Sequence, residues 1–260
     1  MDLQLTNKVA LVTGGSRGLG RAICLGLAAE GARVAVNYYR DLARGIDLVD
    51  EATDLAREIK QRHGSDALPV PGDMGKPSDI LQMFRLTETA FGPPDVLVNN
   101  AGVWPTGFVK DTTEAQWNSV QQVNLTGPFI ASREAVRRWI DAGRGGRIVN
   151  ITSQAAFHGS TTGHAHYAAS KAGLVALTVS LAREVAQYGI HVNAVAPGFM
   201  LTEMARDAID QHKEQYLARI PLRRVADPAE VANVVVFLAS DAASYMTGAT
   251  VDATGGMLMR

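Results

Sequence analysis

Short apolar runs alternate along the chain with longer segments whose apolar residues recur every three or four positions. Runs of the first kind are typical of buried strands, and segments of the second kind are typical of amphipathic helices. The expected strands cover residues 8–13, 33–37, 67–71, 95–99, 146–152, 191–196 and 249–252. The expected helices cover residues 21–31, 41–63, 80–91, 113–142, 167–188 and 228–238. This alternation predicts an α/β fold, a doubly wound parallel sheet of about seven strands with helices on both faces.

Glycines and small polar residues follow several of the expected strands. Gly14, Asn99, Ser153 and Pro197 each stand at or just beyond such a strand end. Ligands of open parallel sheets bind at the carboxyl ends of the strands. The sequence therefore predicts one binding site at this edge, within a single domain that spans residues 1–260.

A glycine-rich turn joins the first expected strand to the first expected helix. Its spacing is Gly14-x-x-x-Gly18-x-Gly20. Glycines let a backbone approach a pyrophosphate closely, and a helix N-terminus stabilises its charge. A plain strand-to-helix turn is the alternative, but the strand–turn–helix context favours a dinucleotide cofactor.

The end of the second expected strand lacks the acid that would bind a free ribose hydroxyl. Asn37, Tyr38 and Arg40 occur there instead. Arg17 and Arg40 could hold a 2′-phosphate, or they could be solvated surface charges. We expect the phosphate-bearing cofactor, NADPH or NADP, rather than NADH or NAD.

Tyr167 and Lys171 are four residues apart in an alanine-rich segment that is predicted to be helical. Both side chains would then share one helix face. A nearby ammonium favours the phenolate and lowers the tyrosine pKa, so the pair could exchange a proton with a carbonyl or alcohol oxygen. Two unrelated amphipathic side chains on a helix surface are the alternative reading.

Two other polar features stand close to this segment. Asn124 falls within an expected helix, where it must satisfy neighbouring backbone or hold a water. His158, His164 and His166 precede Tyr167. No carboxylate or cysteine lies near them in sequence, so we expect no metal site, and the histidines either shape a substrate pocket or face solvent.

The composition narrows the classes of partner. Of 260 residues, 25 are Lys or Arg and 26 are Asp or Glu, which gives a net charge of −1 and no electrostatic footprint for nucleic acid or an anionic membrane. Cys24 is the single cysteine, so no internal disulfide can form and a reducing compartment is expected. Residues 1–8 lack the apolar core of a signal peptide, so a cytoplasmic location is expected. Residues 200–219 are polar and are predicted to form a lid.

Together, these motifs resemble the short-chain dehydrogenase/reductase family, which has a Rossmann-type fold. The resemblance rests on the glycine turn, Asn99-Asn-Ala-Gly102, Asn124, Ser153, Tyr167-x-x-x-Lys171 and Pro197-Gly198, in the family's order through almost the whole chain. Residues 197–202 and the tail at 245–256 are most similar to those of 3-oxoacyl-[acyl-carrier-protein] reductases. Polyol, sugar and hydroxysteroid dehydrogenases share much of the pattern. A non-catalytic nucleotide-binding regulator is a third reading, which the complete proton-transfer set disfavours.

The resemblance implies a role for each catalytic residue. Tyr167 would donate the proton in reduction and accept it in oxidation, and Lys171 would lower its pKa and bind the nicotinamide ribose. Ser153 would hydrogen-bond the reacting oxygen, and Asn124 would keep a water in the proton relay. The residues expected to contact the cofactor are Gly14, Ser16, Arg17, Gly18, Leu19, Gly20, Asn37, Tyr38, Arg40, Asp73, Met74, Asn100, Ala101, Gly102, Tyr167, Lys171, Pro197, Gly198, Met200 and Thr202.

The resemblance also implies partners. The substrate would be a small carbonyl compound or alcohol, and it could be carried on acyl carrier protein, docked by Arg137 and Arg183. A homotetramer is expected, with isologous faces supplied by the helices that begin at Thr113 and Tyr167. The chain departs from the family pattern in two places, since the Ser153–Tyr167 spacing is one residue longer than usual and the segment after Tyr38 is also longer.

Overall fold

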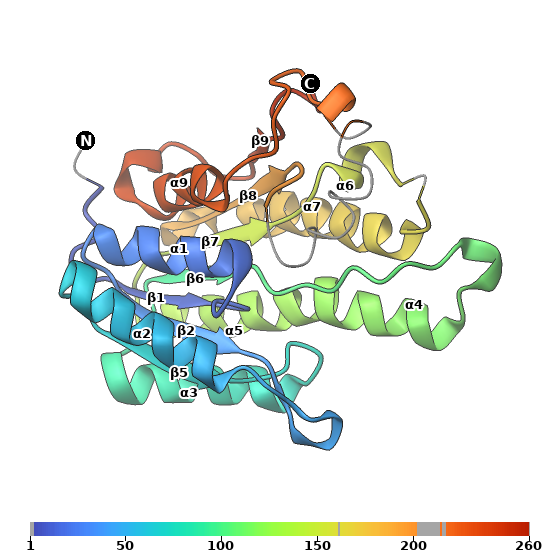
Figure 1. The fold of residues 1–260 in the computed structure, drawn as a ribbon. Helices are drawn as coiled ribbons and strands as arrows, with labels where there is room; N and C mark the ends of the chain where they lie inside the picture. The colour runs from blue at the N-terminus through green and yellow to red at the C-terminus, as the bar shows by residue number, and fades with distance from the viewer. Residues whose placement is uncertain (1–2, 161, 202–213, 215–216, 260) are drawn as a thin grey trace.

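A seven-stranded parallel sheet forms the centre of the computed structural model, which describes residues 3–160, 162–201, 214 and 217–259 (Figure 1). Its strand order is β5-β2-β1-β6-β7-β8-β9, and each neighbouring pair is parallel. The strands are β1 Val9–Val12, β2 Arg33–Tyr38, β5 Ala67–Pro71, β6 Val96–Asn99, β7 Gly146–Ile151, β8 Ile190–Pro197 and β9 Thr250–Ala253. The predicted doubly wound sheet is confirmed.

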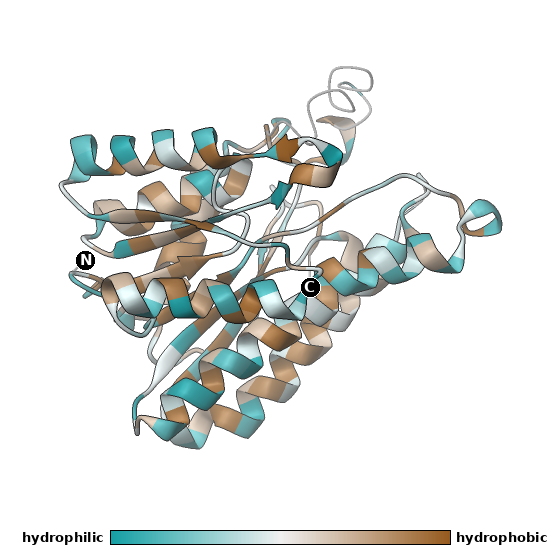
Figure 2. Cartoon of the chain, turned by 90° about the horizontal axis from the view of Figure 1, so that it is seen from below, coloured by the Kyte–Doolittle hydropathy of each residue, from teal (hydrophilic) through white to brown (hydrophobic). Residues whose placement is uncertain are grey.

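Helices cover both faces of this sheet. The helices α1 (Gly18–Ala29), α2 (Val49–His63) and α9 (Pro228–Ala239) pack on one face. The helices α3 (Pro77–Phe91), α5 (Gly127–Asp141) and α7 (Ala165–Val185) pack on the other. Figure 2 shows the apolar parts of these helices turned toward the sheet. Two apolar cores result, one on each side of the sheet.

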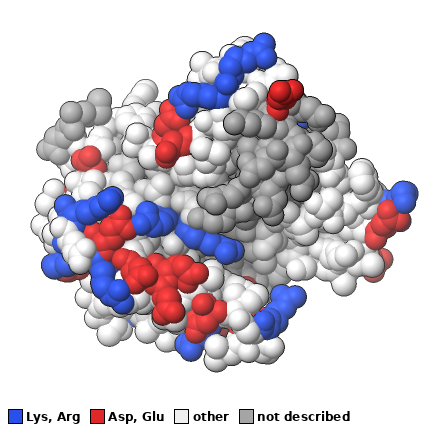
Figure 3. Space-filling model, in the orientation of Figure 1, with Lys and Arg blue, Asp and Glu red and all other residues white. Residues whose placement is uncertain are grey.

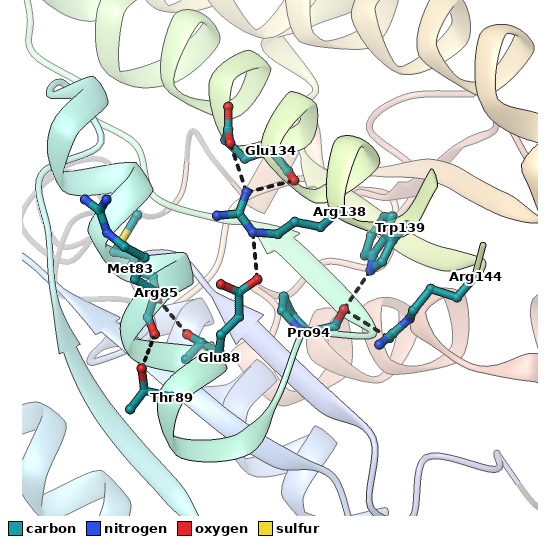
Figure 4. Close-up of polar contacts among 10 residues, drawn as sticks. Met83, Arg85, Glu88, Thr89, Pro94, Glu134, Arg138, Trp139 and Arg144 are labelled. Atoms are coloured by element: carbon teal, nitrogen blue, oxygen red, sulfur yellow. Dashed lines mark hydrogen bonds and ion pairs between the residues drawn. The ribbon is translucent and has the colours of Figure 1, made fainter. Parts of the chain in front are cut away.

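Polar contacts fasten α5 to α3 and to the start of β6 (Figure 4). Arg138 donates to Glu88 of α3 over 2.7 Å and to Glu134, one turn earlier on α5, over 2.9 Å. The fully buried Trp139 donates its indole N–H to the carbonyl of Pro94 over 2.7 Å. These contacts fix the helix that leads out of the segment containing Asn124.

The helix predicted over 41–63 begins later than expected. It starts at Val49, and residues 40–47 form a small hairpin of β3 (Arg40–Asp41), a short 3-10 turn and β4 (Ile46–Asp47). The Asp41 carboxylate accepts the backbone N–H of Arg44 over 3.3 Å, and Gly45 adopts a left-handed φ of 68°. Asp41 therefore favours a turn over a helix start. The hairpin accounts for the extra length after Tyr38.

The helix predicted over 113–142 is confirmed, with one local change. The helix α4 (Glu114–Gln121) begins with a capping box at Thr113, widens into a π segment over Gln122–Thr126, and continues as α5. Figure 1 shows α4 projecting beyond the sheet, with the chain after β6 running alongside it. A short helix, α6 (Ala155–His158), lies in the predicted loop before Tyr167. Most of the predicted lid lies outside the described residues.

Charged side chains of both signs are interspersed on the face drawn in Figure 3, most densely around α2. Such a mixture gives no extended field of one sign, as the net charge of −1 suggests. Over the described residues, every helix is too short or too polar to cross a bilayer.

Candidate active site

The site lies where β1 and β6 meet, which is the point at which the winding of the sheet reverses. Thr13 directly follows β1, and its hydroxyl accepts the backbone N–H groups of Asn100 and Ala101 over 2.9 and 3.0 Å. The Asn100 side chain donates back to the carbonyls of Thr13 and Gly14. The two loops are thus joined at the carboxyl edge of the sheet, which is where such sheets bind ligands.

The glycine turn has a shape that other residues would disrupt. Gly14 has a φ of 59°, and an added Cβ would lie 2.9 Å from the Cα of Ala101. A Cβ on Gly20 would lie 2.0 Å from the carbonyl oxygen of Gly14. The helix α1 begins at Gly18 with no side-chain cap at Arg17 and no acid in its first turn. Its first N–H groups and positive dipole end therefore suit a pyrophosphate.

Asn37 supports this turn from the neighbouring strand β2. Its side-chain oxygen accepts the N–H of Gly14 over 2.9 Å, and its amide nitrogen donates to the carbonyls of Val70 and Gly72 over 3.2 and 3.1 Å. The side chain is buried and already hydrogen-bonded at both ends. Asn37 therefore acts in this structure by holding the glycine turn in place.

The two arginines predicted to bind a 2′-phosphate differ in their surroundings. Arg40 lies on the hairpin, and its Nε is 3.1 Å from a carboxylate oxygen of Asp47. Arg17 is exposed at the start of α1, and no ion pair with the described residues involves it. Arg17 is thus the more available cation for a phosphate.

The structure brings Ser153, Tyr167 and Lys171 together, as the sequence predicts. Ser153 follows β7 and forms a hydrogen bond with Tyr167 of α7. The Lys171 ammonium lies 5.7 Å from the Tyr167 ring centroid and donates to the carbonyl of Ile151 over 2.7 Å. Only 3% of the Lys171 surface is exposed. The arrangement provides a hydroxyl pair for a substrate oxygen and a cation behind it.

The pKa of Tyr167 is raised, not lowered as predicted. Burial raises the pKa because it disfavours the phenolate, and the hydrogen bond from Ser153 offsets this in part. Burial also lowers the pKa of Lys171 to about 8. Tyr167 therefore holds its proton at neutral pH in this structure and is set to act as an acid.

Asn124 is fully buried in the π segment and hydrogen-bonded through its side chain. Its oxygen accepts the N–H of Val103 over 2.9 Å, and its nitrogen donates to the carbonyl of Val103 and to the Ser170 hydroxyl. An added Cβ on Gly102 would lie 3.3 Å from the Asn124 oxygen and 3.6 Å from the Lys171 nitrogen. Asn124 therefore ties the loop after β6 to the helix that carries Tyr167 and Lys171.

Two of the three histidines lie beside Tyr167, each with its own partners. The ring of His164 stacks on Trp104, and Nδ1 of His166 accepts the backbone N–H of Tyr167 over 2.8 Å. His158 is exposed on α6. Among the described residues, no group of three or more His, Cys, Asp or Glu side chains could hold a metal ion.

The other predicted cofactor contacts lie along the same edge of the sheet or just below it. Asp73 follows β5, and its carboxylate accepts the N–H of Gly75 over 2.8 Å. Met200 forms an isolated bridge with Ala226 after β8, and Thr202 lies outside the described residues. The predicted cofactor contacts that have not yet been described are all buried or partly buried. They are Ser16, Leu19, Tyr38, Met74, Ala101, Pro197 and Gly198.

The arginines predicted to dock a carrier protein lie far from Tyr167. Arg183 is in the last turn of α7 and Tyr167 is in its first, so they are about 24 Å apart at the rise of an α-helix. Arg137 lies near the end of α5 and is 3.5 Å from Glu134. These positions argue against the prediction that Arg137 and Arg183 dock a carrier over Tyr167, because each helix runs away from the site toward the amino ends of the strands.

Sequence reasoning missed three contributors to the site. Thr13 clamps the loop after β6, Ser170 links Asn124 to the carbonyl of Tyr167, and Trp104 packs against Tyr167. The position of Thr13 just before the glycine turn was an available signal. Nothing in the sequence places Trp104 beside Tyr167, because the two are distant along the chain.

Comparison with known proteins finds similarity along nearly the whole chain. A family model described as enoyl-(acyl carrier protein) reductase matches residues 14–258. A 3-oxoacyl-[acyl-carrier-protein] reductase FabG of Staphylococcus epidermidis is 41% identical over 253 residues, which are 97% of this chain and 100% of that protein. The Aquifex aeolicus FabG is 39% identical over 99% of this chain and 100% of that protein. The crystal structure of a short-chain type dehydrogenase/reductase from Mycobacterium marinum superposes with a TM-score of 0.91 at 34% identity, covering 100% of this chain and 99% of that one.

Proposed function

Because the chain belongs to the short-chain dehydrogenase/reductase family of oxidoreductases, we propose that it reduces the 3-keto group of an acyl thioester with NADPH. Membership of the family implies a nicotinamide cofactor, and the names of the FabG relatives support the thioester substrate. The observation that carries the proposal is the Ser153–Tyr167 hydroxyl pair with the buried Lys171 behind it.

The glycine turn and its surroundings fit the cofactor. The uncapped start of α1 would hold the pyrophosphate, and Arg17, with Arg40 of the hairpin, would hold the 2′-phosphate. Lys171 would bind the nicotinamide ribose. A bound nicotinamide would supply hydride to the carbonyl carbon.

The chain's own residues supply the proton and hold the substrate. The Ser153 hydroxyl donates a hydrogen bond to the substrate carbonyl oxygen and so orients it beside Tyr167. As negative charge develops on that oxygen, the Tyr167 hydroxyl donates its proton, and the carbonyl becomes a secondary alcohol. The Lys171 ammonium stabilises the resulting phenolate, and Asn124 holds the loop after β6 against the helix that carries both residues.

The test is a substrate panel with both cofactors. NADPH and NADH consumption would be followed with an acetoacetyl thioester, a crotonyl thioester, simple ketones and sugars, and NADP reduction would be followed with polyols and hydroxysteroids. We expect acetoacetyl thioester with NADPH to give the highest kcat/KM. Preference for crotonyl thioester would instead indicate an enoyl reductase, as the description of the family model suggests. Preference for a polyol, sugar or hydroxysteroid would overturn the proposed substrate class.

A second comparison addresses the carrier. We propose that the thioester is presented on acyl carrier protein, which the FabG relatives' names support. Carrier-linked acetoacetyl should then be reduced with a lower KM than the free thioester. Equal KM values would favour a free substrate. Because Arg137 and Arg183 lie far from Tyr167, changing both to Glu should leave the ratio of the two KM values, carrier-linked to free thioester, unchanged.

A further inference from the structure

An aromatic pair stands beside the catalytic tyrosine. The rings of Trp104 and His164 stack with centroids 4.4 Å apart and planes 18° from parallel. Trp104 also meets the Tyr167 ring edge-on, with centroids 6.4 Å apart. The pair is built from two loops, one after β6 and one before α7, and neither ring takes part in the proton transfer described above.

The His164 ring is held firmly. Its Nε2 lies 3.2 Å from the Thr106 hydroxyl, and its Nδ1 lies 3.0 Å from the Thr162 hydroxyl and 3.4 Å from that of Ser160. Both nitrogens are thus engaged by hydroxyl groups. The two loops are further joined by a hydrogen bond from the Gly107 N–H to the Gly163 carbonyl over 2.7 Å.

His164 is also kept neutral. The residue is 5% exposed, and burial, together with the neighbouring His166, lowers its pKa. A neutral, hydrogen-bonded ring makes a fixed stacking partner and a poor proton donor. These contacts place His164 where it can hold the Trp104 ring in position.

Trp104 remains partly exposed to solvent. It is half-buried, and its indole N–H has no hydrogen-bond partner among the described residues. A substrate whose carbonyl oxygen meets the Tyr167 hydroxyl must place its carbonyl substituents within a few ångströms of that ring. Since the indole meets the Tyr167 ring edge-on, it is placed to contact one of these substituents.

We propose that Trp104, positioned by His164, is a specificity-determining residue that favours carbonyl substrates carrying an aromatic or other flat apolar substituent next to the reacting carbon. The proposal rests on the proposed function, because it takes Tyr167 as the group that meets the carbonyl oxygen. Aromatic contacts of this kind favour binding beyond the effect of the area they bury.

The experiment compares two thioesters of one thiol that differ only in this substituent, benzoylacetyl and acetoacetyl. In Trp104→Ala, the ratio of kcat/KM for benzoylacetyl to that for acetoacetyl should fall about 10-fold, and Trp104→Phe should retain most of the ratio. The control is Tyr188→Ala, at an exposed aromatic residue beyond the far end of α7. An unchanged ratio in Trp104→Ala, or an equal fall in Tyr188→Ala, would overturn the proposal.

A second set of variants tests the positioning role of His164. His164→Ala should raise KM for benzoylacetyl thioester with little change in kcat. His164→Phe keeps an aromatic ring at this position and should have a KM close to that of the wild-type protein. His158→Ala is the matched control on the exposed α6. Equal losses of kcat and of thermal stability in His164→Ala and His164→Phe would show that the ring only supports the fold.

Binding separates this proposal from the proposed function. Calorimetric titration of benzoylacetyl thioester into the NADP complex of Tyr167→Phe protein requires no turnover. Weaker binding after an added Trp104→Ala change would support the role of Trp104. It would do so even if the wild-type enzyme reduced no thioester, because the lack of reduction would refute only the proposed reaction. Unchanged binding would refute the role of Trp104.

Discussion

Lys171 is a buried cation whose position explains both its own chemistry and that of Tyr167. Its ammonium donates to the Ile151 carbonyl over 2.7 Å, which compensates in part for the loss of water around it. Burial nevertheless lowers its pKa to about 8, so most Lys171 side chains remain charged at pH 7. The charge is therefore available where a phenolate forms on Tyr167.

Replacement of Tyr167 by Phe tests the proton donor. Tyr167→Phe removes the hydroxyl that Ser153 engages and keeps the ring that packs against Trp104. Turnover should fall by about 100-fold or more, since a positioned general acid contributes at least that much. Cofactor affinity, measured by fluorescence titration, should change little. Tyr188→Phe, an exposed tyrosine beyond the end of the same helix, is the control, and similar rates for the two variants would contradict the assignment.

The raised pKa of Tyr167 predicts opposite pH dependences for the two reaction directions. Carbonyl reduction needs the protonated hydroxyl and should persist through neutral pH and fall at alkaline pH. Alcohol oxidation needs the phenolate and should rise with pH. Ser153→Ala removes the hydrogen bond that lowers the pKa, so the falling limb of the reduction profile and the rising limb of the oxidation profile should both move to higher pH. Profiles of kcat/KM would measure this, and a limb that moved to lower pH would refute the role given to Ser153.

At the scale of elements, the loops at the strand ends are joined into one unit by a few polar side chains. Thr13 joins the glycine turn to the loop after β6, and Asn124 joins that loop to α7. The β3–β4 hairpin directly follows β2 in the chain. Arg40 and Asp47 of this hairpin form an ion pair.

The unequal surroundings of the two arginines lead to a cofactor prediction. Arg17→Ala should weaken NADPH binding by about 10-fold and leave NADH binding nearly unchanged, because a hydrogen bond to a charged group contributes about 1.5–3 kcal/mol. Arg40→Ala should weaken NADPH binding less than Arg17→Ala does, since Asp47 already forms an ion pair with Arg40. Asp47→Asn, which removes that ion pair, should strengthen NADPH binding. Dissociation constants for both cofactors would measure these effects, with Arg57→Ala on the exposed face of α2 as control. Equal affinities of the wild-type protein for the two cofactors would contradict the prediction.

At the scale of the whole molecule, several large apolar side chains remain on the surface. Trp117 and Phe129 are 41% and 45% exposed on α4 and α5, and Tyr245 is fully exposed near the C-terminus. Aromatic residues are enriched at the interfaces between protein chains.

The family resemblance predicts a tetramer, and these exposed aromatic residues are candidates for its interfaces. Sedimentation velocity should show a species of four chains, and Phe129→Glu should shift it toward smaller species, because a charge would be buried at an isologous face. Tyr188→Glu, at a different exposed aromatic residue, serves as a comparison. A wild-type monomer at micromolar concentration would contradict the prediction.

Local patterns in the sequence were sufficient to predict the sheet, its helices and the proximity of Tyr167 and Lys171. Apolar runs and helical periodicity depend on neighbouring residues, and Tyr167 and Lys171 are neighbours on one helix turn, so their relation needs no tertiary information. The glycine turn is equally local, because its spacing directly follows a strand.

The hairpin, the aromatic pair and the direction of the Tyr167 pKa shift were decided by the tertiary structure. Asp41 and Gly45 turned a helix start into a hairpin, through hydrogen bonds and a left-handed φ that outweigh helix propensity. Trp104 meets Tyr167 only because two distant loops are joined at the sheet edge. The pKa depends on how much water the fold removes from around the phenol, and burial is a property of the assembled chain that no spacing between residues encodes.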